Sequence, residues 1–247
     1  MKICFSTLGC PDFEWPDVYS MAKDLGFDGI ELRCYGLPAD PYRSKPFTGV
    51  LLPKTVAKLK SLKLEIPCIS SNCCLNEQDN EMQNRKELLA CMELAQAVGA
   101  PYVRVLGDRY SEVTGTVDDD YVASVLTSLI PEAEKHDVTL LVETNGVFSD
   151  TKRLKAMLDK IGSIHVAAVW DMHHPYRYGG ESPEETVSTL GNYIKFVQTK
   201  DSSFKDGVLR YEMMGRGDLP LDDMMAALAR INYTGFISLE WVKRWMP

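Results

Sequence analysis

The chain has 247 residues, a hydrophobic content of 45% and a formal net charge of −8 at pH 7. This length suits a single barrel domain, and the acidic balance argues against nucleic acid, whose partners carry basic surfaces. No apolar stretch approaches the roughly 18 residues of a membrane-spanning helix. We therefore expect no nucleic-acid partner and no membrane partner.

The cysteines and the N-terminus both indicate a cytoplasmic protein. The seven cysteines include no CxxC pair, and Cys73 and Cys74 are adjacent. These features predict reduced, buried thiols rather than disulfides or a zinc–thiolate site. The opening MKICFSTLG is too short for a signal peptide and is interpreted as a first strand.

Apolar runs alternate with amphipathic stretches from end to end. Strands are predicted at 2–7, 28–33, 64–70, 102–106, 138–143, 165–170, 193–199 and 236–239. Helices are predicted at 15–25, 48–62, 79–98, 118–135, 150–161, 183–190 and 221–231. Gly26 and Gly99 follow two helices where a left-handed cap favours glycine, and Pro131 is expected to kink or split the fourth helix.

The strands are continuous apolar runs, which is typical of a parallel sheet buried on both faces. Eight of them favour a closed (β/α)₈ TIM barrel over an open sheet with two unprotected edges. We predict one domain over residues 1–247. Only seven residues follow Glu240, so the eighth helix is expected to be missing or vestigial. The loop at 36–47 could fill its place, or a second subunit packed on Trp245 and Met246 of a homo-oligomer.

Four oxygen-bearing side chains lie near the ends of the last four predicted strands. They are Glu143, Asp171, Gln198 and Glu240, separated by 28, 27 and 42 residues. The first two separations match one strand–helix–strand unit of roughly 30 residues. Because the carboxyl ends of barrel strands meet at one rim, we expect these groups to converge there. Each acid taken alone could instead be a solubilising rim residue.

Three carboxylates held close together repel unless a cation lies between them, and a divalent metal is the usual solution. Oxygen ligands favour Mn²⁺ or Mg²⁺, with Co²⁺ and Zn²⁺ as alternatives. The sequence therefore predicts one divalent metal ion held by Glu143, Asp171, Gln198 and Glu240.

Further polar and aromatic residues are candidates for binding the substrate. His174 follows Asp171 by three residues and could reach a substrate oxygen beside the metal. Lys200 and Arg216 could bind a hydroxyl, phosphate or carboxylate, or could be solvated surface charges. Asn72, Asn145, Glu31 and Arg33 are further candidates for the pocket lining. Trp15 and Trp241 could form an apolar wall for a sugar ring, or belong to the core.

These residues carry a resemblance to a known family. The segments are CFSTLGCPDFEWPD, AKDLGFDGIELR, CMELAQAVGAPYVRVLGD, VTLLVETN, WDMHH, VQTKD, GRGDLP and GFISLEW. Over nearly its whole length the chain resembles the xylose isomerase-like TIM barrels of the sugar phosphate isomerase/epimerase group. The resemblance implies Mn²⁺, Mg²⁺, Co²⁺ or a similar ion on Glu143, Asp171 and Glu240, with His174 and Arg216 facing substrate.

The family usually has histidine at the position of Gln198, although dehydratases of the superfamily that act on dehydroshikimate use glutamine there. The superfamily's endonucleases need extra histidines after strands three and four, and SSNCCLN and VLGDRY supply none.

Three functions remain open at this point. The first is a metal-dependent isomerase or epimerase of a small polyhydroxylated sugar or sugar phosphate. In that reaction the metal stabilises an enediolate while Glu143 and Glu240 move the proton. The second is a metal-dependent dehydratase of the dehydroshikimate or inosose type, in which a β-hydroxyl departs from the same enolate. The third is a barrel without catalysis that binds a ligand.

Overall fold

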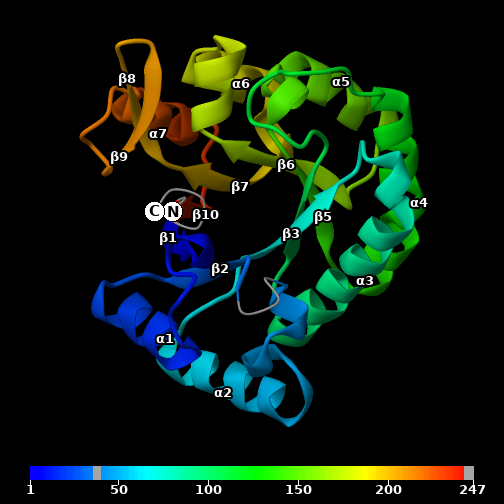
Figure 1. The fold of residues 1–247 in the computed structure, drawn as a ribbon, viewed down its shortest axis with the longest axis vertical. Helices are drawn as coiled ribbons and strands as arrows, with labels where there is room; N and C mark the ends of the chain where they lie inside the picture. The colour runs from blue at the N-terminus through cyan, green and yellow to red at the C-terminus, as the bar shows by residue number, and fades with distance from the viewer. Residues whose placement is uncertain (36–39, 242–247) are drawn as a thin grey trace.

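The protein forms a closed barrel of eight parallel strands surrounded by helices (Figure 1). The structure, a computed structural model, describes residues 1–35 and 40–241. The strand order around the barrel is β1-β10-β7-β6-β5-β4-β3-β2, with every neighbouring pair parallel. The barrel strands are β1 (Lys2–Ser6), β2 (Gly29–Arg33), β3 (Cys68–Cys74), β4 (Tyr102–Leu106), β5 (Thr139–Glu143), β6 (Val166–Asp171), β7 (Ile194–Thr199) and β10 (Phe236–Leu239).

Seven α-helices in the described residues connect the strands and cover the outside of the barrel (Figure 1). They are α1 (Trp15–Asp24), α2 (Leu52–Leu62), α3 (Glu81–Val98), α4 (Asp119–Lys135), α5 (Thr151–Ile161), α6 (Pro183–Leu190) and α7 (Leu221–Arg230). Their predicted positions are confirmed to within a few residues at each end. Helix α4 runs unbroken through Pro131, so the expected split was wrong.

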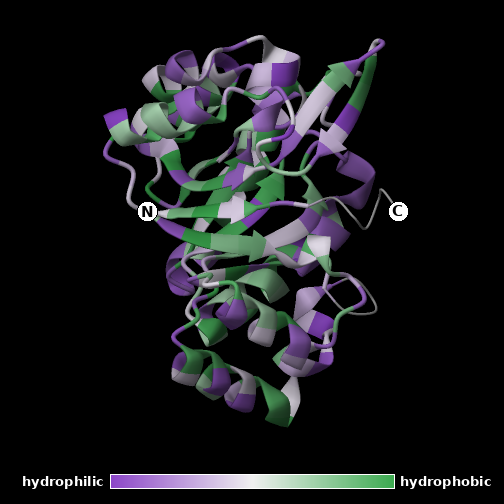
Figure 2. Ribbon diagram, turned by 90° about the vertical axis from the view of Figure 1, so that its left-hand side faces the viewer, coloured by the Kyte–Doolittle hydropathy of each residue, from purple (hydrophilic) through white to green (hydrophobic). Residues whose placement is uncertain are grey.

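The barrel interior changes from apolar to polar along the strands because side chains alternate between the two faces of each strand. Outward residues of β5 to β7 pack with the helices, whereas an inner layer is apolar and consists of Cys4, Cys68, Leu141, Ala167, Val169, Phe196 and Phe236. Two residues further along, the inward positions of β5 and β6 carry Glu143 and Asp171. Figure 2 shows hydrophobic residues along the barrel strands, with hydrophilic residues interspersed around the helices. The polar end of the barrel is therefore its carboxyl end.

The sequence missed a two-stranded antiparallel hairpin between β7 and α7. It consists of β8 (Asp201–Lys205) and β9 (Val208–Glu212) and projects beyond the barrel (Figure 1). The third strand was predicted at 64–70 but lies at 68–74. Residues 64–67 precede it, and its second half consists of mostly polar residues, 70–74. Polar side chains in a strand buried by the barrel gave no apolar run to follow.

No described α-helix lies between α7 and α1 around the barrel (Figure 1). In keeping with this, Ile3 on β1 is 47% exposed. The described part of the loop expected to fill this place, residues 40–47, does not: its turns η2 (Pro41–Arg43) and η3 (Lys45–Phe47) pack against α3 and α2, and residues 36–39 lie outside the described residues. Residues 242–247, with Trp245 and Met246, lie outside the described residues, so the homo-oligomer stays a prediction.

All seven cysteines are buried and unpaired, as predicted. No described helix has both the length and the apolar character that crossing a membrane requires.

Candidate active site

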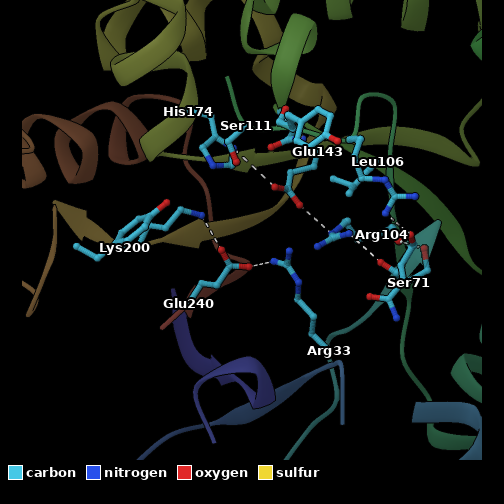
Figure 3. Close-up of a pocket in the computed structure, with 14 residues that line it drawn as sticks. Arg33, Ser71, Arg104, Leu106, Ser111, Glu143, His174, Lys200 and Glu240 are labelled. Carbon is cyan, nitrogen blue, oxygen red and sulfur yellow. Dashed lines mark hydrogen bonds and ion pairs between the residues drawn. The ribbon is translucent and has the colours of Figure 1, made fainter. Parts of the chain in front are cut away.

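A cavity of about 580 Å³ opens at the carboxyl ends of the strands (Figure 3). Its charged and ionisable lining consists of Arg33, Arg104, Arg109, Glu143, His174, Lys200 and Glu240. The remaining lining residues are Ser71, Asn72, Leu106, Tyr110, Ser111, Asn145 and Tyr211. Asp171 and Gln198 are fully buried and lie beneath this lining.

Glu143, at the end of β5, is held by an arginine from the neighbouring strand. Arg104 Nε lies 2.8 Å from Glu143 Oε2, and Arg104 Nη1 donates to the Ser71 carbonyl oxygen at 2.8 Å (Figure 3). Both charged side chains are almost completely buried. Burial favours protonation of Glu143, but the charges of Arg104 and Arg33 outweigh burial and hold the pKa of this carboxyl below its ordinary value. Glu143 is therefore ionised at neutral pH.

Lys200 joins the other two acids. Its ammonium donates to Glu240 Oε2 at 2.6 Å (Figure 3) and also donates to Asp171 Oδ2. Arg33 is paired with the other oxygen of Glu240. Burial alone would raise the pKa of Asp171, but His174 and Lys200 hold it well below its ordinary value. The three acids are thus opposed by three buried cations.

His174 is a neutral imidazole at physiological pH. Its Nδ1 lies 3.2 Å from the carbonyl oxygen of Thr144, which can only accept, so Nδ1 carries the proton. Burial lowers the pKa of His174 to about 4, although the charge of Asp171 opposes this. The lone pair of Nε2 then faces Asp171 Oδ2 at 3.6 Å, and Glu143 Oε1 is 3.7 Å from Nδ1.

Gln198 is oriented by a buried glutamate on β2. Gln198 Nε2 donates to Glu31 Oε1 at 2.7 Å, and the same carboxylate accepts from Ser70 and Ser238. The carbonyl oxygen of Gln198 is buried and has no hydrogen-bond partner among the described residues. The orientation of the Gln198 amide is thus fixed, while its carbonyl oxygen remains without a donor among the described residues. Gln198 is the register partner of Asp171 in the pairing of β6 with β7.

The donor set fits a divalent cation. One ligand atom each from Glu143, Asp171 and His174 lies within 4.8 Å of the others. Nε2 of neutral His174 and Asp171 Oδ2 are both acceptors, yet they face each other at 3.6 Å without a proton between them. Ligand atoms about 2.1 Å from a common ion lie roughly 3 to 3.5 Å apart.

The structure thus gathers Glu143, Asp171 and His174, whereas the sequence assigned His174 to the substrate and grouped the two acids with Gln198 and Glu240. Glu240 stands on the far side of the Lys200 ammonium. The two asparagines lie in the lining, where Asn145 Nδ2 donates to the carbonyl oxygens of Asp108 (2.8 Å) and Tyr110 (3.1 Å). Asn145 therefore positions the loop after β4. Asn72 Oδ1 accepts from the Cys34 thiol at 3.1 Å.

Three predicted substrate contacts lie elsewhere. Trp15 is buried among Tyr35 and Phe47, with ring centroids at 5.5 and 4.8 Å, because helix α1 turns it toward the core. Trp241 packs over Gly9, where an added Cβ would lie 3.2 Å from that of Trp241. Arg216 is exposed on the turn after β9. None of the three belongs to the described lining of the cavity.

Sequence reasoning missed Arg104, Arg109, Tyr110 and Tyr211 as lining residues. Arg104 had a readable signal, because it stands alone as a charge inside the apolar run YVRVL. A fully buried arginine needs an acidic partner, so such a position predicts an ion pair. Tyr110 and Tyr211 lie on a loop and on the unforeseen hairpin, and no periodicity indicates their positions.

Comparisons with known proteins agree with this architecture. Residues 20–246 match the family described as xylose isomerase-like TIM barrel. None of the curated proteins matches the sequence. Three solved structures illustrate the structural similarity. The IOLI protein with a binding zinc atom has a TM-score of 0.81 at 18% identity, over 98% of this chain and 89% of that one.

The probable 3-DHS dehydratase AsbF from Bacillus anthracis has a TM-score of 0.79 at 18% identity, over 98% of this chain and 93% of that one. D-psicose 3-epimerase in the presence of D-fructose has a TM-score of 0.77 at 16% identity, over 97% and 84%. At these identities the similarity establishes the fold, and the chemistry must be argued from the side chains.

Proposed function

The chain belongs to the xylose isomerase-like TIM barrel family, and from this premise we propose that it is a divalent-metal-dependent isomerase or epimerase of a small polyhydroxylated carbonyl compound. The observation that carries the proposal is the convergence of Glu143, Asp171 and His174 at the floor of one cavity, with Glu240 across from them. Structural relatives named as an epimerase and a dehydratase support enzymatic activity in general.

Glu143, Asp171 and His174 would hold the ion, with Gln198 and Glu240 as further oxygen ligands. A divalent ion there would act as a Lewis acid toward the carbonyl and hydroxyl oxygens of the substrate. Mn²⁺ or Mg²⁺ suits the oxygen-rich donor set, and the His174 nitrogen also admits Co²⁺ or Zn²⁺.

The two glutamates would carry the proton. Glu143 and Glu240 are both ion-paired with arginine, so each rests ionised and can accept the proton α to the carbonyl. After taking up a proton from solvent in the cavity, the second glutamate would deliver it to the opposite face for epimerisation, or to the neighbouring carbon for isomerisation, while the first glutamate releases the proton it accepted to solvent. Arg104 Nη2 is buried at the cavity wall without a hydrogen-bond partner in the described chain. It could bind the oxygen on which negative charge develops.

A dehydratase is the second candidate, and the same arginine favours it. Arg104 Nη2, together with Arg33 and Lys200 in the lining, suits a substrate that carries a carboxylate, as dehydroshikimate does. In that reaction the same enolate would expel a β-hydroxyl. A barrel that binds its ligand without catalysis is the third candidate.

One experiment separates the three. Metal-free protein is supplied with Mn²⁺ or Mg²⁺ and incubated in D₂O with ketoses, inososes and dehydroshikimate, and proton NMR follows the α position. We expect deuterium incorporation without loss of water from at least one polyol ketone. Loss of water from dehydroshikimate would select the dehydratase. If no compound exchanges its α proton when the protein is fully loaded with metal, the remaining candidate is a barrel that binds a ligand without catalysis.

A further inference from the structure

Lys200 occupies the space between two of the proposed metal ligands. Its ammonium hydrogen-bonds to Asp171 Oδ2 and to Glu240 Oε2, and the side chain is only 4% exposed. Within the described part of the chain, both hydrogen bonds of this ammonium go to these two carboxylates. The ammonium therefore occupies two carboxylates that would otherwise be available to hold a divalent ion.

The arginines of the site are held differently. Arg104 is anchored to the Ser71 carbonyl as well as to Glu143, and a guanidinium is a rigid planar group. Lys200 is a flexible chain that lines the cavity of about 580 Å³, so its ammonium has room to leave the two carboxylates. Of the three cations that balance the acids, Lys200 is the one that can be displaced.

We propose that Lys200 is an internal competitor of the metal ion. While its ammonium bridges Asp171 and Glu240, an incoming ion meets a positive charge and only part of its ligand set. When the ammonium swings into the cavity, Glu240 becomes available as a ligand and the site closes around the ion. This inference rests on the proposed metal site and adds that the chain itself weakens the affinity of that site.

The test compares the metal affinity of Lys200→Met with that of the wild type. Methionine keeps the length and the apolar stem but removes the charge. Metal-free proteins are titrated with Mn²⁺ by calorimetry, and thermal unfolding is recorded with and without Mn²⁺. We expect Kd for Mn²⁺ to fall at least tenfold in Lys200→Met, and Mn²⁺ to raise its Tm more than that of the wild type. Lys195→Met, an exposed change on β7, the strand that precedes Lys200, should match the wild type in both measurements.

Each result decides the proposal. A Lys200→Met chain that is unfolded without metal and folds when Mn²⁺ is added supports competition. Equal or weaker Mn²⁺ affinity in the variant overturns it but leaves the metal-dependent reaction standing. A variant that stays unfolded in saturating Mn²⁺ also overturns it. If neither protein binds Mn²⁺, both this inference and the proposed metal-dependent function fail.

Discussion

The two halves of the barrel contribute opposite charges to one cavity. From β2 to the loop after β4, the described lining contains Arg33, Arg104 and Arg109 but no carboxylate. From β5 to β10 it contains Glu143 and Glu240, with Asp171 directly beneath. His174 and Lys200 also come from this second half. The carboxylates proposed to act in the reaction therefore come from the second half of the barrel. Most of the positive charge that keeps them ionised, on Arg33 and Arg104, comes from the first half.

This division indicates different consequences for mutations in each half. A change among the acids of the second half removes a group proposed to touch the substrate or the ion. A change among the arginines of the first half leaves that group in place but removes its counter-charge and, at Arg104, also a proposed contact to a substrate oxygen. The two kinds of variant should therefore be separable by measuring activity and stability side by side.

The largest effect is expected from the second half. Glu240→Gln removes a proposed acid–base group, and such groups contribute about 10²- to 10⁴-fold to rate. We expect kcat to fall by at least about 100-fold, with the fold retained. Deuterium exchange on the substrate found by the panel measures the loss, and circular dichroism checks the fold. Near-normal turnover would show that Glu240 takes no part in the mechanism. It would also weaken the distinction between reactive acids in the second half and counter-charges in the first.

The first half should show its effect in stability. Arg104→Met leaves the Glu143 carboxylate buried without its cation, and breaking a buried pair costs about 3–5 kcal/mol. We expect a loss of this size in the free energy of unfolding, measured with urea. The double variant Arg104→Met/Glu143→Leu removes both charges and should recover most of the loss. A single variant as stable as wild type would contradict the assigned role of Arg104.

Acidification should destabilise the second half through its buried histidines. Burial lowers the pKa of His174 to about 4 from an ordinary 6.5 and also lowers the pKa of His173. Since the unfolded chain binds these protons first, stability is full above pH 6.5 and falls as pH drops toward 4. We expect about 2–3 kcal/mol per histidine over this window. Urea unfolding of metal-free protein measures the slope, which should be shallower in His174→Asn.

The smallest effect is expected at Arg216. It is exposed and does not belong to the described lining of the cavity. Arg216→Ala should therefore change kcat/KM by less than about threefold, because it removes no contact to a substrate bound in the cavity. A loss of 100-fold in the exchange assay would show that the turn after β9 closes over the substrate, and would restore the role that the sequence suggested.

Most of the strands could be predicted because they carry apolar runs that pack against helices, whereas the bounds of β3 were misplaced because residues 70–74 of that strand are mostly polar. The acids could be predicted because they end those runs. Arg33 and Arg104 were harder, since their inward direction depends on the strand alternation within a closed barrel. The position of Lys200 directly after strand seven could be predicted. Its contacts with Asp171 and Glu240 could not, because they depend on how the ends of three strands meet in the folded barrel. The hairpin was missed because its short strands carry no continuous apolar run, although Asp206 and Gly207 form the two-residue turn that typically joins antiparallel strands.

The hairpin of β8 and β9 forms part of the cavity wall without belonging to the barrel. Tyr211 reaches the lining from β9, outside the barrel ladder, and its ring lies 5.6 Å from that of His173. The Asp201 carboxylate holds the end of the segment through the backbone N–H groups of Gly215 (2.9 Å) and Gly217 (2.8 Å). Insertions or exchanges between these anchors would leave the register of the eight barrel strands intact, because β8 and β9 pair only with each other. Protein engineers could therefore graft new hairpins here to change which compound is bound, without altering the acids at the carboxyl ends of the barrel strands.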